Sequence, residues 1–248
     1  MATSRSVAAI RDLEERYPTH AMATELDVTD PEQACAAMEA AVERFGRLDV
    51  VVSNAGLGLF GALEDLAEEE LRREFETNVF GAVNTIRAAL PQLRAQRSGL
   101  IVQISSLEGV APAVAGESAY AATKFAVEGL CEGLAHDVAH LGIEVMIVEP
   151  GPIRTRFGER AVANPPRDPD YQESVGSALE WFAGLDGRQP NDPDRVADAI
   201  ITTVESPDRP RRLALGVEAI EAIRGKLAAH NHDLDRWETL SRSVAVGA

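Results

Sequence analysis

Residues 100–124 read LIVQISSLEGVAPAVAGESAYAATK, and this stretch decides the fold. Its first residues are aliphatic and β-branched, which is typical of a strand buried on both faces. A loop containing Gly109, Pro112 and Gly116 comes next, and the remainder has the composition of an apolar helix. A buried strand that leads through a loop into a helix is the building unit of a parallel sheet.

The same unit recurs along the chain. Short apolar runs predict strands at residues 21–26, 48–53, 100–105, 143–149 and 211–216. Helical patterns lie between them, at residues 30–46, 68–97, 117–141 and 194–205 and after Gly216. The first helix has the clearest start, because Asp30 is a capping residue and Pro31 suits the first helical position. The alternation predicts an α/β fold, a doubly wound, Rossmann-like parallel sheet with helices on both faces.

Length and composition predict a single domain spanning residues 1–248, of which 45% are hydrophobic. Residues 151–192 interrupt the alternation with prolines and form an insertion after a strand end, where open α/β sheets bind ligands. Residues 217–248 form a C-terminal helical segment. Four aromatic residues could line a substrate pocket or form a core for the insertion, and the sequence leaves both open: Phe157, Trp181, Phe182 and Trp237.

Charge and cysteine content exclude several partners. The formal net charge of −16, with no basic block, disfavours nucleic acid and anionic membranes. No run of about eighteen apolar residues is present, and early acidic residues argue against a leader, so we expect a cytoplasmic protein. Cys35 and Cys131 lie far apart, and the His136/His140 and His230/His232 pairs lack further ligands. We therefore expect neither a disulfide nor a metal site.

Tyr120 precedes Lys124 by four residues, which places both side chains on one helix face. Lys124 and Lys226 are the only lysines among 24 basic residues, and lysine, unlike arginine, has a pKa that its surroundings move readily. An adjacent ammonium favours the phenolate, so we expect Lys124 to lower the pKa of Tyr120 from about 10. The pair then suits proton transfer near neutral pH, although an ordinary exposed helix pair is equally compatible with the spacing.

Residues at the predicted strand ends favour the catalytic interpretation. The strand before the tyrosine helix ends in Ser105 and Ser106, whose hydroxyls could hydrogen-bond a carbonyl oxygen. Neighbouring strands end in SNAG at 53–56 and EPGP at 149–152. Small and polar residues therefore line one edge of the sheet.

The segment GLGLFG at 56–61 fits the pattern G-x-G-x-x-G, but its context does not fit a dinucleotide loop. Such a loop opens a helix and is followed about twenty residues later by an acidic residue at a strand end. Here the next predicted strand ends in serine. We therefore interpret GLGLFG as a strand-end loop whose glycines allow a ligand to approach the backbone.

The chain resembles the single-domain short-chain dehydrogenase/reductase family over residues 3 to about 216. The motifs that carry the resemblance occur in the family's order: LDVTD at 26–30, SNAG at 53–56, TNVFGA at 77–82, ISS at 104–106, YAATK at 120–124 and EPGPIRT at 149–155. The resemblance implies reversible hydride transfer between a nicotinamide cofactor and a carbonyl/alcohol pair. It also implies a homodimer or homotetramer formed through helices 68–97 and 117–141.

The resemblance assigns a role to each motif. Tyr120 would be the general acid/base, and Lys124 would activate it and bind the nicotinamide ribose. Ser106 would orient the substrate oxygen, and Asn78 would hold a water molecule of the proton relay. Ser106 precedes Tyr120 by 14 residues where 13 is common, so the loop carries one extra residue and Ser105 is the weaker candidate. The cofactor-binding residues would be Arg5, Asp27, Val28, Asn54, Ala55, Gly56, Tyr120, Lys124, Pro150, Gly151, Ile153 and Thr155.

The chain departs from the family pattern at its start. The family begins with a strand, a TGxxxGxG loop that receives the pyrophosphate, a helix and a second strand, and ATSRS at 2–6 matches the segment after that second strand. In the family's strand order 3-2-1-4-5-6-7, the missing pair would leave a gap between residues 21–26 and 48–53, with costly unpaired edges. We therefore expect Met1 to be an internal methionine of a longer protein. The alternative is a genuine deletion.

Three functions are compatible with these patterns. The first is an oxidoreductase that uses NADP, which Arg5 favours over NAD, and acts on a lipophilic ketone or secondary alcohol, because Leu57, Leu59 and Phe60 adjoin the expected site. The second is a non-catalytic sensor or scaffold that has lost cofactor binding. The third is an epimerase or dehydratase, but such enzymes carry a substrate domain longer than the segment after Gly216.

Overall fold

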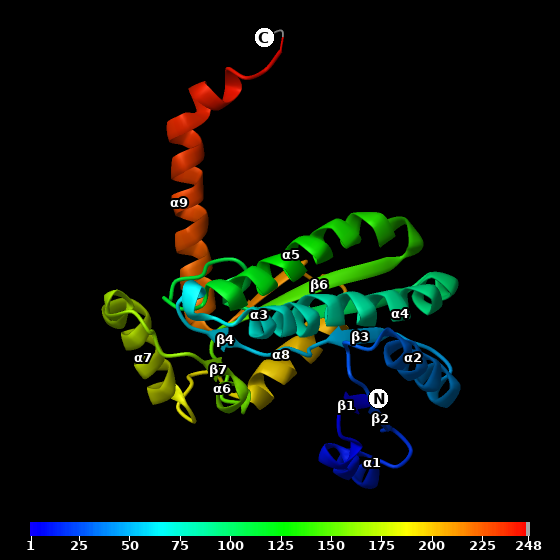
Figure 1. Ribbon diagram of the computed structural model, residues 1–248. Helices are drawn as coiled ribbons and strands as arrows, with labels where there is room; N and C mark the ends of the chain where they lie inside the picture. The colour runs from blue at the N-terminus through cyan, green and yellow to red at the C-terminus, as the bar shows by residue number, and fades with distance from the viewer. Residues whose placement is uncertain (247–248) are drawn as a thin grey trace.

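The computed structural model describes residues 1–246, and its centre is a four-stranded parallel sheet of order β3-β5-β6-β8 (Figure 1). These strands span Val50–Ser53, Gly99–Ile104, Ile143–Pro150 and Arg212–Leu215, respectively. Ile101, Val102, Ile147 and Val148 on the two central strands are completely buried. The predicted doubly wound parallel sheet is confirmed, because strands of this composition must be covered on both faces.

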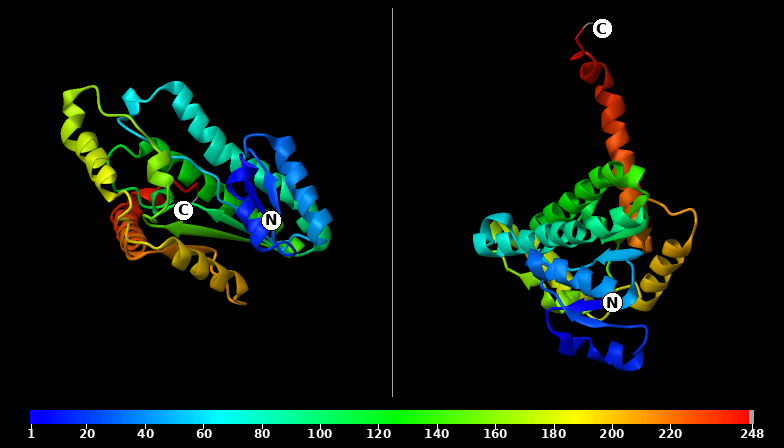
Figure 2. Two further views of the ribbon diagram at one scale, coloured as in Figure 1. Left: turned by 90° about the horizontal axis from the view of Figure 1, so that it is seen from below. Right: turned by 90° about the vertical axis from the view of Figure 1, so that its right-hand side faces the viewer.

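Helices cover both faces of the sheet (Figure 2). On one face, α2 (Pro31–Phe45), α4 (Gly81–Gln96) and α5 (Ser118–Val138) enclose a core that includes Ile101 and Ile147. On the other face, Ile200 and Val204 of α8 (Pro193–Glu205) pack against Val102 and neighbouring residues. Successive residues of a strand point to opposite faces, which explains how Ile101 and Val102 belong to different cores.

Helix boundaries agree with the expected local chemistry. The Asp30 carboxylate accepts hydrogen bonds from the backbone N–H groups of Glu32 and Gln33 at the start of α2, and Gly46 ends that helix with a φ of 83°. The helix expected over residues 68–97 is interrupted. It consists of α3 (Glu68–Phe75), a π-helical turn at Glu76–Phe80 and α4.

The first two strands form a separate sheet. β1 (Ala2–Ser4) pairs in parallel with β2 (Ala23–Glu25), and α1 (Arg11–Arg16) connects them. A cavity of about 1320 Å³ lies between this pair and β3, where Val50 and Val52 are 38% and 50% exposed. The expected gap in the sheet is confirmed. The expectation that a pair of strands is missing is wrong, because residues 2–4 themselves have extended backbone and pair with β2.

The insertion adds a small sheet that sequence patterns did not predict. β4 (Leu59–Phe60) pairs in parallel with β7 (Val162–Ala163), while α6 (Phe157–Arg160) precedes β7 and α7 (Ser177–Leu185) follows it. GLGLFG therefore leads into a strand and opens no helix, as interpreted from the sequence. Two-residue strands are too short for an alternation signal.

The chain ends in α9 (Val217–Arg242), which projects away from the rest of the molecule (Figure 1). Within residues 1–246, no helix combines the length and apolar character needed to cross a bilayer.

Candidate active site

The carboxyl ends of β3, β5 and β6 open onto a cavity of about 930 Å³. Most residues predicted for the catalytic end of the site line this cavity: Asn54, Gly56, Ser106, Tyr120, Lys124, Pro150, Gly151, Ile153 and Thr155. The cavity between β1 and β3 is lined by the remaining predicted cofactor residues, which are Arg5, Asp27, Val28 and Ala55. Asn54 and Gly56 line both cavities. Asn78 lines neither cavity.

Tyr120 and Lys124 lie in the first turns of α5, and both side chains are buried. The tyrosine ring packs against Phe60 and Phe157, with ring centroids 5.7 Å away in both cases. The Lys124 Nζ donates a hydrogen bond to the Ile104 carbonyl at 3.2 Å and lies 5.5 Å from the centroid of the Tyr120 ring. The ammonium therefore contacts the ring as a cation–π pair.

The pKa of Tyr120 is raised, chiefly by burial, and hydrogen bonding with Ser106 only partly offsets that effect. Charges on Glu117, Glu108 and Glu74 raise the tyrosine's pKa further. Burial also lowers the pKa of Lys124 to about 8, against the opposing effects of Glu128 and Glu74. The expected net lowering of the Tyr120 pKa is therefore wrong for this structure, because burial raises that pKa.

Ser106 caps a short 3₁₀ helix at Leu107–Gly109, with its Oγ accepting a hydrogen bond from the Glu108 N–H at 3.2 Å. Ser106 and Tyr120 line the same cavity, and the serine hydroxyl lowers the pKa of the tyrosine. Ser105 donates its backbone N–H to the Val148 carbonyl and so continues the sheet.

Asn78 lies in the π-helical turn and clamps the loop after β3. Its Oδ1 accepts a hydrogen bond from the Leu57 N–H at 2.8 Å, while its Nδ2 donates to the Leu57 carbonyl at 2.8 Å and to Thr123 Oγ1 at 3.0 Å. The side chain is thus fully engaged within the protein. Single π-helical turns are frequent at functional sites, and here the turn aims Asn78 at the loop that lines the cavity.

Sequence patterns missed a group of buried carboxyl side chains around Tyr120. Glu74 is completely buried, and its Oε1 accepts a hydrogen bond from the Leu59 N–H at 2.9 Å. Glu108 and Glu117 line the cavity and hydrogen-bond with each other, and burial raises the pKa of Glu117 to about 9. The sequence does show two glutamates in a mostly apolar stretch at 107–119. Their burial could not be predicted, because a loop has no periodic pattern that separates buried from exposed positions.

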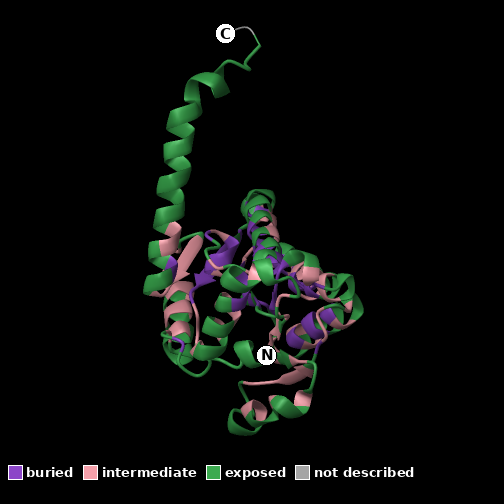
Figure 3. Ribbon diagram, turned by 60° about the vertical axis from the view of Figure 1, so that its left-hand side comes forward, coloured by how far each residue is buried: buried purple, intermediate pink, exposed green. Residues whose placement is uncertain are grey.

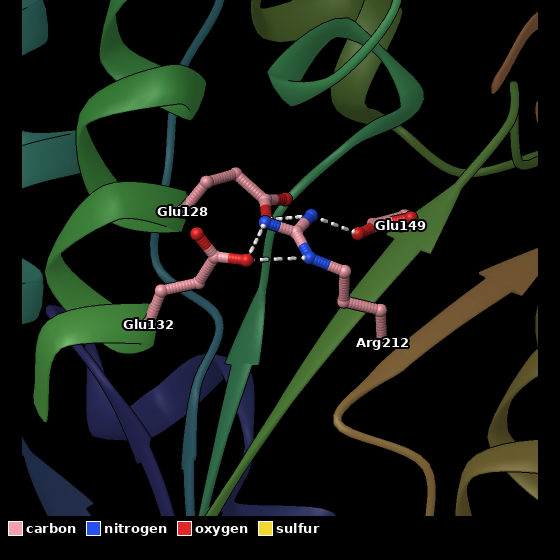
Figure 4. Close-up of polar contacts among 4 residues, drawn as sticks. All are labelled: Glu128, Glu132, Glu149 and Arg212. Carbon is pink, nitrogen blue, oxygen red and sulfur yellow. Dashed lines mark hydrogen bonds and ion pairs between the residues drawn. The ribbon is translucent and has the colours of Figure 1, made fainter. Parts of the chain in front are cut away.

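A second cluster of carboxyl groups surrounds Arg212 near the candidate site (Figure 4). Arg212 of β8 forms ion pairs with Glu128 and Glu132 of α5 at 2.6 and 2.7 Å and with Glu149 of β6 at 2.5 Å. The Glu128 and Glu149 side chains are almost inaccessible, at 4% and 3% exposure. Arg212 thereby joins the sheet edge to the helix that bears Tyr120.

The residues present fit a dinucleotide. Hydrogen bonds from the Thr29 backbone and hydroxyl lower the pKa of Asp27, which keeps its carboxylate available as an acceptor. A side chain at Gly56 would place its Cβ 3.3 Å from Asn78 Oδ1 and 3.7 Å from Lys124 Nζ, so only glycine leaves room for a ligand to approach the loop. The described residues hold no TGxxxGxG segment.

Comparisons with known proteins identify the family of the chain. Residues 2–165 match the family model described as short chain dehydrogenase. The chain is 33% identical over 246 residues to oxidoreductase BOA17 of Botryotinia fuckeliana, covering 99% of this chain and 89% of that one.

Solved structures lead to the same conclusion. A short-chain dehydrogenase from Streptomyces avermitilis has a TM-score of 0.87 and 42% identity, covering 98% of this chain and 88% of that one. An alcohol dehydrogenase from Thermococcus sibiricus, solved with 5-hydroxy-NADP, has a TM-score of 0.68 and 26% identity, covering 86% and 83%. The fold and site thus define a Rossmann-like oxidoreductase. The chain belongs to the short-chain dehydrogenase family.

Proposed function

We propose that the chain interconverts a ketone and a secondary alcohol, with Tyr120 transferring the proton at the substrate oxygen. The observation that carries this proposal is the position of Tyr120 in an apolar cavity that Ser106 and Lys124 also line. A nicotinamide cofactor, when bound, supplies the hydride to the carbonyl carbon or accepts it from the alcohol.

The chain's own residues supply the proton chemistry. The raised pKa of Tyr120 keeps the phenol protonated at neutral pH, which is the form that a general acid needs. In the reductive direction, the phenol O–H bond breaks and its proton moves to the carbonyl oxygen as hydride adds to the carbon. Ser106 holds that oxygen beside the phenol, and Lys124, buried next to the ring, provides positive charge as the phenolate forms.

The walls of the cavity support a lipophilic substrate. Apolar and aromatic side chains dominate the lining on the side of the insertion: Leu57, Phe60, Phe157, Leu179, Trp181 and Phe182. Phe60 and Phe182 stack with ring centroids 5.1 Å apart. Phe157, Trp181 and Phe182 line the cavity, which supports the substrate-pocket interpretation for these three residues, whereas Trp237 is exposed on α9.

Arg5 supports NADP over NAD. Its charge acts on Asp27, and both residues line the cavity between β1 and β3. A guanidinium there could pair with a 2′-phosphate. We expect Arg5→Ala to weaken binding of 2′,5′-ADP at least 10-fold and to leave AMP binding unchanged, measured by calorimetry. Equal losses for both nucleotides would contradict the assignment.

Tyr120→Phe tests the reaction itself. We expect kcat for reduction of a panel of aliphatic and aromatic ketones, followed by NADPH absorbance, to fall about 10²- to 10⁴-fold. Tyr17→Phe is the control, since Tyr17 is 50% exposed on the surface. Turnover by the Tyr120→Phe variant at the wild-type rate would refute the mechanism.

A non-catalytic sensor is the second candidate, favoured by the open cavity between β1 and β3 beside the predicted cofactor residues. A folded protein that neither binds NADPH nor turns over any ketone or alcohol would support it. A cytoplasmic location and a homo-oligomeric state remain predictions.

A further inference from the structure

α9 leaves the body of the molecule after its first two turns. Ala219 is completely buried, and Glu218 and Ala222 line the candidate active-site cavity. From residue 224 to residue 246, every residue is exposed (Figure 3). The free part of the helix, residues 224–242, is about 28 Å long at about 1.5 Å per residue.

α9 carries a largely apolar stripe with heptad spacing, which starts in the turns that pack on the body and continues along the free part. Ile220, Leu227 and Leu234 are seven residues apart, and Ile223, His230 and Trp237 occupy the positions between them. Leu227, Leu234 and Trp237 are 54%, 57% and 52% exposed. A single helix of this length is only marginally stable in water, and exposed heptad residues are the usual signature of a helix that packs on another.

We propose that this stripe pairs with the same stripe of a second copy of the chain, as an antiparallel two-helix coiled coil. The register is set by the residues at its edges. With the midpoint between residues 228 and 229, Leu227 lies opposite His230 of the other copy, Ile223 opposite Leu234, and Ile220 opposite Trp237. Lys226 then lies beside Asp233 of the other copy, twice by symmetry.

Charge excludes the neighbouring arrangements. A shift of one heptad in either direction would bring Lys226 beside Lys226 or Asp233 beside Asp233 of the other copy. A parallel pair would bring Asp233 beside Glu238. Each alternative opposes like charges, which the proposed register avoids.

A membrane surface is a poorer occupant for the stripe. Acidic and basic side chains are nearly balanced along α9, with acids at 218, 221, 233, 235 and 238 and bases at 224, 226, 236 and 242. Helices that lie on anionic membranes carry a basic polar face instead. The proposed contact is also distinct from the helices at 68–97 and 117–141, through which the sequence resemblance predicted an oligomer.

Sedimentation velocity on the full chain tests the proposal without any cofactor. The protomer mass is 26.6 kDa, and we expect an assembly of at least two copies at micromolar concentration. Leu234→Asp should raise the dissociation constant of the α9 contact at least 10-fold, whereas Ala228→Asp, exposed on the opposite face of the helix, should not. Circular dichroism verifies that both variants fold. A monomeric wild-type protein, or an assembly unaffected by Leu234→Asp, would overturn the proposal.

Exchange of the flanking charges tests the register with surface substitutions only. Lys226→Asp and Asp233→Lys should each weaken assembly about 5-fold or more, because each creates two like-charge contacts. The double variant restores opposite charges and should assemble to within about twofold of the wild type. Failure of the double variant to recover would overturn the antiparallel register.

Discussion

Tyr120 lies beside a pair of buried carboxyl groups that share the cavity with it. Glu117 and Glu108 are 4% and 7% exposed, and each has one carboxyl oxygen without a protein partner. Burial, and then the charge of Glu108, raises the pKa of Glu117 to about 9. Because its pKa is about 9, Glu117 is protonated at neutral pH, and we expect it to share that proton with Glu108.

Glu117→Gln should therefore change how stability depends on pH. Folding raises the pKa of the Glu117 carboxyl from about 4.5 to about 9. The contribution of this carboxyl to protein stability is therefore fully present below about pH 4.5 and is lost as the pH rises through about 9. We expect the variant to match the wild type near pH 4.5 and to be more stable by about 1 to 3 kcal/mol near pH 9, by urea unfolding. Glu180→Gln, on an exposed residue, should show no such divergence. Parallel pH curves for Glu117→Gln and the wild type would refute the shared proton.

At the scale of elements, the π-helical turn between α3 and α4 fixes the loop after β3. Asn78 satisfies both backbone polar groups of Leu57 and one hydroxyl of α5, so one side chain joins three segments. A regular helix over residues 68–97 would rotate Asn78 away from that loop. The turn therefore brings TNVFGA and SNAG together.

Asn78→Ala should cost about 2 to 3 kcal/mol of unfolding free energy, because it leaves buried polar groups without partners. Asn84→Ala is the comparison, since the Asn84 side chain makes one hydrogen bond, to the Val28 carbonyl at 3.0 Å, and should cost about 1 kcal/mol. Chemical denaturation measures both. Equal costs would show that the clamp adds nothing beyond a single hydrogen bond.

Across the whole molecule, Arg212 connects the sheet edge with the helix that carries the site. Burial raises the pKa of Glu128 to about 7 even with Arg212 nearby, so both buried glutamates depend on this guanidinium for their charge. The three ion pairs link β8, β6 and α5 across the sheet (Figure 4). Loss of the arginine would leave two buried carboxyl groups unpaired.

Arg212→Met should destabilise the protein by about 3 to 5 kcal/mol at pH 8. The loss of stability caused by Arg212→Met should become smaller toward pH 5, because Glu128 and Glu149 are then protonated and need no cation beside them. Since burial raises the pKa of both carboxyl groups, the stability of the variant falls as the pH rises. Arg209→Met is the control, since Arg209 pairs at the surface with Glu144 and should cost less than about 1 kcal/mol. Thermal unfolding across pH measures both, and a deficit independent of pH would contradict this account.

Periodicity and spacing were sufficient to predict the main strands and helices. Buried strands have continuous apolar sequences, and helices have apolar residues at helical spacing that begin at a capping residue. The motif order also placed Tyr120, Lys124, Ser106 and the cofactor residues along one edge. Sequence patterns could not find β4 or β7, since two residues are too few to show alternation, and they could not distinguish the π-helical turn from the α-helix around it.

The sequence by itself determined the α/β fold, the family and the edge of the sheet that bears the candidate site, since these depend on local patterns that each segment carries alone. Only the tertiary structure decided the electrostatics of the site. The pKa of Tyr120 depends on burial and on carboxyl groups brought from α3 and from the loop between β5 and α5, and the spacing of Tyr120 and Lys124 could reveal neither.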